Sequence, residues 1–162
     1  MFIEEKKYKT ILDSVTNVCV DVVLRYREKL LLIKRTEEPM KGVPWPVGGR
    51  LHKGETSENC ARRKIKEEIG IDYYAPLIPI GFYEDTYSAN SFSDDTSYST
   101  ISIVWAGVLT DKQAKKIETD STADGYGFYT RLPRRFKVTM FSDFANKIEE
   151  LDNISEPKKG PV

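Results

Sequence analysis

The residues best suited to chemistry lie between Gly49 and Ile71, where carboxylates and an arginine share one predicted helix. Glu67 and Glu68 supply oxygen atoms of the kind that Mg²⁺ binds, and Arg63 supplies a rigid fork of donors that matches phosphate oxygens. The neighbouring Gly48 adds a flexible turn, which allows a backbone carbonyl to join a metal shell. This combination predicts a site for a divalent cation and a diphosphate.

The helix that carries these groups has defined ends. Thr56 or Ser57 can cap its first turn, because a hydroxyl accepts a hydrogen bond from an unpaired N–H. Gly70 can end it, because glycine tolerates the left-handed conformation. Apolar residues recur every four positions, at Ala61, Ile65 and Ile69. The helix is therefore predicted to pack on one side and to present its charged residues on another.

The segment resembles the Nudix box, the sequence pattern of the Nudix hydrolases. The chain matches eight positions of that pattern in register: Gly49, Glu55, Arg63, Ile65, Glu67, Glu68, Gly70 and Ile71. The alternative interpretation is a solvated helix with ordinary ion pairs, as most charge runs are. That alternative accounts for the adjacent glutamates but not for the whole register.

Lys64 departs from the family pattern, which usually has a glutamate at this position. A lysine is cationic and repels a metal ion at close range. Two interpretations follow. The site binds fewer metal ions and relies on Glu68, with Glu67 acting directly or through water, or the chain has lost catalysis.

The N-terminal half is similar to one branch of the family, the GDP-mannose mannosyl hydrolases, at Met1-Phe2, at residues 18–21 and 31–36, and from Trp45 to Arg50. That branch also lacks the glutamate at the position of Lys64. The resemblance implies an α/β fold, an α/β/α sandwich with a mixed β-sheet. It implies Mg²⁺ as cofactor, with Mn²⁺ as an alternative, a nucleotide sugar as substrate, and a homodimer.

The resemblance also implies roles for individual residues. The metal would be bound by the Gly48 carbonyl and by Glu68, with Glu67 as a further ligand. The diphosphate would be held, or the site oriented, by Arg35, Arg50 and Arg63. The sugar or nucleotide would contact Asp21. The branch's tyrosine falls at Ser102, and Tyr98 nearby is the candidate for its role in substrate binding.

The general base is the main departure from that branch, which uses a histidine before the last core strand. Residues 120–128 contain no histidine, and the single histidine of the chain is His52. Asp124 is the predicted catalytic carboxylate by position, and Asp120 and Glu84 are further candidates.

Three functions therefore stay open. The first is hydrolysis of a GDP-sugar such as GDP-mannose by attack at the sugar carbon, which gives GDP and the sugar. The second is cleavage between phosphates of a nucleoside triphosphate or a nucleotide sugar. The third is a catalytically silent module that binds a nucleotide or a protein.

Length and composition exclude some partners. The 162 residues predict one domain over residues 1–152 and a disordered tail over 153–162. Positive and negative residues number 25 each, which argues against general binding to nucleic acid or anionic membranes. With no apolar run of membrane length and no targeting segment, the expected location is cytoplasmic.

The predicted secondary structure places these motifs along the chain. Helices are expected at residues 3–12, 56–70, 111–117 and 141–151. Strands are expected at residues 15–25, 29–34, 77–83, 101–109 and 125–130, with loops at 39–49 and 84–97. Asp21 falls inside a strand of valines, so it either has a buried partner or faces outward.

Overall fold

The sheet is built around β1 (Asn17–Tyr26), a strand rich in valine that is buried along most of its length. Branched side chains favour strands because they pack well on a pleated surface. β1 runs parallel to β6 (Tyr98–Val108) and antiparallel to both β2 (Lys29–Arg35) and β4 (Val47–Arg50). The computed structural model describes residues 3–38, 40–88, 97–121, 123–134, 136 and 139–140.

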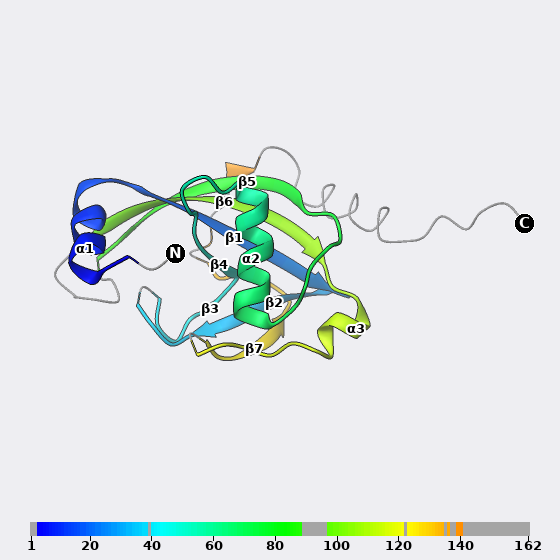
Figure 1. Cartoon of the computed structure of the whole chain (residues 1–162). Helices are drawn as coiled ribbons and strands as arrows, with labels where there is room; N and C mark the ends of the chain where they lie inside the picture. The colour runs from blue at the N-terminus through cyan, green and yellow to red at the C-terminus, as the bar shows by residue number, and fades with distance from the viewer. Residues whose placement is uncertain are drawn as a thin grey trace, which may run out of the picture.

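The remaining elements complete a mixed α/β fold (Figure 1). They are α1 (Glu5–Ser14), β3 (Pro44–Trp45), α2 (Ser57–Ile69), β5 (Ile78–Tyr87), α3 (Asp111–Ala114), β7 (Ala123–Tyr129) and β8 (Thr139–Met140). Within the described residues the sheet has eight strands in the order β3-β2-β1-β6-β5-β8, with β4 paired to β1 and β7 paired to β2. The predicted fold class, α/β with a mixed sheet, is confirmed.

Helix α2 lies across one face of this sheet (Figure 1) and has the predicted ends. The Thr56 hydroxyl accepts a hydrogen bond from the Asn59 N–H at 3.2 Å, and Gly70 takes the left-handed conformation at φ 72°. The predicted apolar stripe is buried, and Ile65 and Ile69 are fully covered. Burying a side chain of that size contributes about 1.5–3 kcal/mol, so this stripe fixes α2 on the sheet.

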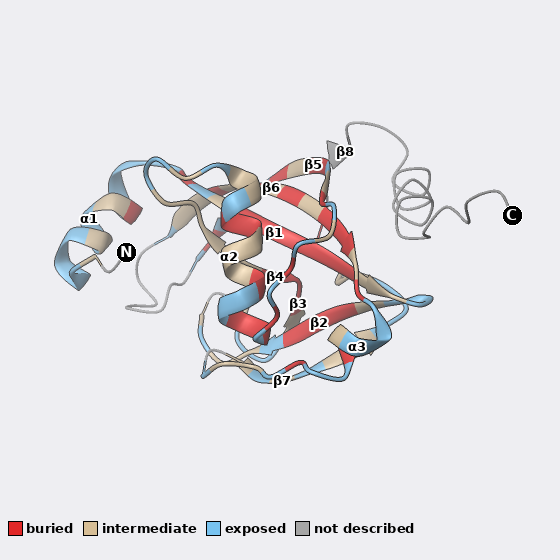
Figure 2. Cartoon of the chain, turned by 45° about the vertical axis from the view of Figure 1, so that its right-hand side comes forward, coloured by how far each residue is buried: buried red, intermediate tan, exposed pale blue. Residues whose placement is uncertain are grey.

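The two faces of the sheet have separate hydrophobic clusters. The alternate β1 residues Val20, Val22 and Leu24 pack with the α2 stripe. Val23 points to the opposite face, where it packs with residues of β5 and β6 and with Phe136. Figure 2 shows β1 buried at the centre of the molecule and β7 more exposed at its edge.

The structure corrects several predicted boundaries. The predicted loop at 39–49 contains β3 and β4, two short strands whose proline and glycine residues concealed their backbone pairing. The predicted loop at 84–97 starts later, because residues 84–87 continue β5 and pair with β6. The predicted helix at 141–151 and tail at 153–162 lie outside the described residues. Among the residues described, no helix is both long and apolar enough to cross a membrane.

Gly48 of β4 faces Asp21 of β1 in the sheet, and the contact leaves no room for a side chain. A Cβ at Gly48 would overlap with Asp21 Oδ1 and would lie 2.5 Å from the Val20 carbonyl oxygen. Because the Val20 atom belongs to the backbone of the central strand, it cannot move aside without disturbing the sheet.

We therefore expect Gly48→Ala to lower the free energy of unfolding by about 1–3 kcal/mol, as measured by urea denaturation. Gly127→Ala is the matched control, because the three atoms nearest to a Cβ on that strand glycine belong to the side chain of Tyr129 and none of them to the backbone. An equal loss in both variants would show that the packing against β1 is not the cause.

Candidate active site

A cavity of about 270 Å³ opens among the strands and α2. It brings together six residues that the sequence assigned to metal, phosphate or substrate: Asp21, Arg35, Gly48, Arg50, Glu68 and Tyr98. They come from β1, β2, β4, α2 and β6, so the fold gathers them from positions far apart in the chain.

Strand alternation explains why β1 and β6 both contribute to this cavity. Successive side chains of a strand point to opposite faces, so every second residue shares a face. The cavity is lined by Asn17, Cys19 and Asp21 of β1 and by Tyr98, Thr100 and Ser102 of β6. Sequence reasoning singled out only part of this set. Polar residues at every second position of two apolar strands are the signal that identifies the rest.

The double glycine of β4 lets α2 approach the cavity closely. The Gly48 N–H donates to Glu68 Oε2 at 3.2 Å. At Gly49, a Cβ would lie 2.9 Å from Lys64 Cε, so the missing side chain makes room for the lysine. Both Glu68 and Lys64 therefore reach the cavity wall across the glycines.

Lys64 bridges the two carboxylates that the sequence assigned to a metal. Its ammonium nitrogen lies 2.7 Å from Glu68 Oε1 and 3.1 Å from Glu67 Oε2. Burial opposes the positive charge, but Glu68 and Glu67 outweigh it and raise the pKa of Lys64. Burial also raises the pKa of Glu68, against the stabilising contacts of Lys64 and Gly48. Lys64 is therefore a charged part of the site, where the sequence had indicated only a repulsive residue.

Arg63 contacts carboxylates of α2 and of the loop before it, and both of its predicted roles stay predictions. Its guanidinium donates to both carboxylate oxygens of Glu55, at 2.8 and 2.9 Å, and to Glu67. A further N–H donates to the Arg50 carbonyl at 3.1 Å. These contacts join α2 to β4 and to the loop before the helix. Arg63 itself does not line the cavity.

Asp21 has the buried partner that a carboxylate among valines requires. The hydroxyl of Tyr83, on β5, donates to Asp21 Oδ2 at 2.7 Å. Asp21 is 5% exposed, which excludes the outward-facing alternative. Burial raises its pKa, and the hydrogen bond from Tyr83 opposes that rise. The cavity therefore has a fixed carboxyl group in addition to its two arginines.

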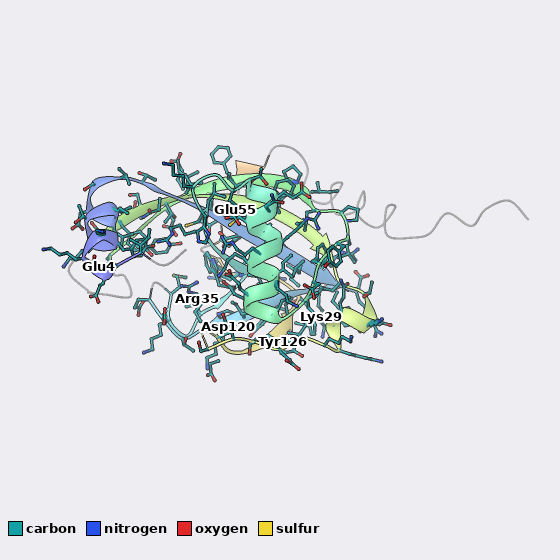
Figure 3. The ribbon with its side chains drawn as sticks, in the orientation of Figure 1. Glu4, Lys29, Arg35, Glu55, Asp120 and Tyr126 are labelled. Atoms are coloured by element: carbon teal, nitrogen blue, oxygen red, sulfur yellow. The ribbon has the colours of Figure 1, made fainter. Side chains whose placement is uncertain are left out.

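The candidate bases lie in different places. Asp124 is exposed on β7, where it pairs with Lys34 at 3.0 Å, and it does not line the cavity. Glu84 is exposed on β5. Asp120 lies near the last turn of α2 (Figure 3), and its N–H donates to the Glu68 carbonyl at 3.4 Å. The catalytic role of Asp124 stays a prediction. The carboxyl groups that line the cavity in the described part of the chain are those of Asp21, Glu37 and Glu68.

The donor atoms of Glu67 and Glu68 suit a divalent ion, since both offer carboxylate oxygens. The described residues nevertheless contain no group of three or more His, Cys, Asp or Glu side chains that could hold one. Both oxygens of Glu68 are bonded already, one to Lys64 and one to Gly48. Each carboxylate oxygen has a further lone pair for an ion, but an ion at Glu68 would lie close to the positive charge of the Lys64 ammonium, which opposes its binding.

The Arg63–Glu55 pair gives a pH-dependent prediction. Arg63 holds the pKa of Glu55 at about 2, below its usual value of 4.5. Because the pKa of Glu55 is lowered in the folded protein, the pair contributes fully to the free energy of unfolding above pH 4.5. That contribution is lost as the pH falls toward about 2. We expect Glu55→Gln to lower the free energy of unfolding by about 2 kcal/mol at neutral pH, with a smaller difference from wild type in acid.

Urea denaturation across this pH range measures the difference. Glu58→Gln is the control, because Glu58 pairs with Arg62 on the same helix but is 45% exposed, where such pairs contribute little. A Glu55→Gln deficit that stays constant from neutral to acid pH would contradict the account.

Known proteins resemble this chain in sequence and in fold. Residues 15–129 match the family model described as the NUDIX domain. An ADP-ribose pyrophosphatase of Methanocaldococcus jannaschii is 42% identical over 66 residues, which are 41% of this chain and 38% of that protein. The low-salt glycan biosynthesis protein Agl8 of Haloferax volcanii is 34% identical over 70 residues, 43% of this chain and 45% of that protein. The chain thus spans less than half the length of these relatives.

Among solved structures, the MutT protein of Methanosarcina mazei Go1 superposes with a TM-score of 0.60 at 18% identity, covering 88% of this chain and 96% of that one. This similarity concerns the fold alone. The match to the NUDIX domain covers well over half of the sequence and includes the whole pattern from Gly49 to Ile71. The chain therefore belongs to the Nudix family.

Proposed function

We propose that the protein hydrolyses a nucleoside diphosphate linked to a sugar, with a GDP-hexose such as GDP-mannose as the specific substrate. The observation that carries this proposal is the composition of one cavity, which combines arginines, buried carboxyl groups and unpartnered polar side chains. The homodimer implied by the resemblance and the cytoplasmic location expected from the sequence stay predictions.

Arg35 and Arg50 are the residues that we expect to bind the diphosphate. Both line the cavity, and a guanidinium binds phosphate oxygens through paired donors. The Arg50 guanidinium lies 4.7 Å from the ring centroid of Tyr8, a cation–π contact that restricts its orientation. Positive charge held in place in this way stabilises the negative charge that develops on a departing nucleoside diphosphate.

Asn17 and Thr100 suit a sugar. They are register partners on β1 and β6, they line the cavity, and they are 7% and 5% exposed. Within the described residues, Asn17 Nδ2 and Thr100 Oγ1 are buried without a hydrogen-bond partner. An unpaired buried polar group costs about 1–3 kcal/mol, which a hydroxylated ligand can recover.

Tyr98 supports the same class of substrate. It lines the cavity, and its ring centroid lies 5.3 Å from that of Tyr87. Aromatic rings of this kind provide a flat surface for a base or a sugar ring. Asp21, fixed by Tyr83, adds an oxygen for a hydroxyl or amino group of the ligand.

Nudix hydrolases generally use divalent metals, and we infer Mg²⁺ or Mn²⁺ as the cofactor. Glu68, with Glu67 and the Gly48 carbonyl, would hold the ion, which when bound neutralises the diphosphate and improves the nucleoside diphosphate as a leaving group. Because Lys64 contacts both glutamates, the position of that lysine would affect how they hold an ion.

Cleavage between the phosphates is the second candidate, favoured by the similarity to an ADP-ribose pyrophosphatase. ADP-ribose is itself a nucleoside diphosphate joined to a sugar, so the arginines and the polar side chains suit both reactions. The two differ in the atom that water attacks, the sugar carbon or a phosphorus.

Hydrolysis in ¹⁸O-labelled water distinguishes these reactions. With GDP-mannose and Mg²⁺, attack at carbon gives GDP and labelled mannose, the result we expect. Attack at phosphorus gives GMP and mannose phosphate, with the label on a phosphate, and would establish the second candidate. We expect Glu68→Gln to lower turnover at least about a hundredfold.

Lys66→Gln is the control for Glu68→Gln, because Lys66 is exposed on α2 and pairs with Asp72 outside the cavity. Ligand-induced thermal stabilisation without turnover of any nucleotide sugar would contradict the proposal and establish a silent binding module.

Thr100→Val tests the sugar contact, because it replaces the unpartnered hydroxyl with a methyl group of similar shape. We expect unchanged or higher stability, since a buried unpaired group is lost, and about tenfold weaker binding of the nucleotide sugar. Binding of GDP alone should stay unchanged in calorimetry. Thr86→Val is the control, because Thr86 is an exposed strand threonine outside the cavity. Unchanged nucleotide-sugar affinity in Thr100→Val would exclude this contact.

A further inference from the structure

The Lys64 ammonium lies where the two box carboxylates converge. It contacts Glu68 Oε1 at 2.7 Å and Glu67 Oε2 at 3.1 Å, and its side chain is 16% exposed. Two carboxylates around one compact positive charge are also the basic arrangement of a magnesium site. The lysine therefore satisfies the same oxygens that a divalent ion would bind.

The position of Lys64 also brings it to the ligand. Its side chain lines the cavity together with Arg35 and Arg50, and its terminal carbons pack over Gly49. An ammonium has three donors, and the described contacts use two, for Glu67 and Glu68. The third donor is available to an anion in the cavity.

We propose that Lys64 is a tethered cation that occupies the metal position between Glu67 and Glu68 in the free protein and binds the diphosphate itself. Lys64 would then compete with a divalent ion for the glutamates, and its ammonium, when displaced from them, would bind the phosphates of the nucleotide. The proposal rests on the proposed function only in taking a diphosphate as the ligand.

This proposal predicts that one variant binds a metal ion more tightly and diphosphate more weakly. Lys64→Met removes the charge but retains an unbranched side chain. Without the competing ammonium, Mn²⁺ alone should bind about 10- to 100-fold more tightly, as measured by electron paramagnetic resonance of the free ion. Without the third donor, inorganic diphosphate should bind about tenfold more weakly in the presence of EDTA, as measured by calorimetry.

Two further variants make the test specific. Lys64→Arg retains the charge, so weak Mn²⁺ binding and metal-free diphosphate binding should both persist. Lys66→Met removes a lysine charge from the same helix, where Lys66 pairs with Asp72 outside the cavity, and both affinities should match wild type. Thermal unfolding of each variant confirms that it is folded.

The proposal is overturned if Lys64→Met leaves both affinities unchanged, or if it changes both in the same direction, as a purely structural residue would. It is equally overturned if Lys66→Met reproduces the effect on Mn²⁺, because the cause would then be net charge. Neither probe contains a nucleoside or a sugar. Failure to hydrolyse GDP-mannose would therefore contradict the proposed function and leave this test unaffected.

Discussion

The contact of Lys64 with Glu67 and Glu68 determines what the site can do. Three glutamates and two cations form a continuous chain of ion pairs, from Glu55 through Arg63 and Glu67 to Lys64 and Glu68. The first pair fixes the loop before α2, and the last reaches the cavity wall. Lys64 thereby neutralises the carboxylate of Glu68, whose burial would otherwise be costly. In our proposal, the same charge also competes with a divalent ion for Glu68.

The sheet makes this arrangement possible by keeping backbone between α2 and the cavity. Gly48 and Gly49 have no side chains, so Glu68 bonds the strand directly and Lys64 packs over it. On β1, Asp21 lies opposite Gly48 and is held by Tyr83 from β5. The glycines are therefore required by packing as well as by chemistry, because at each of them a residue of α2 that lines the cavity contacts the strand.

The sequence predicted the parts of the site whose information is local. Caps, an apolar repeat and a fixed register identified α2 to within one residue at each end, and the resemblance directed attention to Arg35, Arg50 and Asp21. Contacts between distant segments were not predictable in the same way. The hydrogen bond from Tyr83 to Asp21 depends on the order of the strands in the sheet, which the sequence does not show directly. The pairing of β4 with β1 is made by backbone atoms, so side-chain patterns do not reveal it. Lys64 was interpreted as a charge that repels a metal, although its spacing of three and four residues from Glu67 and Glu68 on a helix already allows an ion pair with each.

In our proposal, Lys64 and a divalent ion compete for Glu68. The most direct measurement is anomalous diffraction from crystals of wild type and Lys64→Met soaked without nucleotide, at one Mn²⁺ concentration that saturates the variant. The account predicts a manganese peak beside Glu68 in the variant and none there in wild type, where the Lys64 ammonium stays in contact with Glu68. A manganese peak of equal height in both crystals, with Lys64 turned away from Glu68 in wild type, would contradict it.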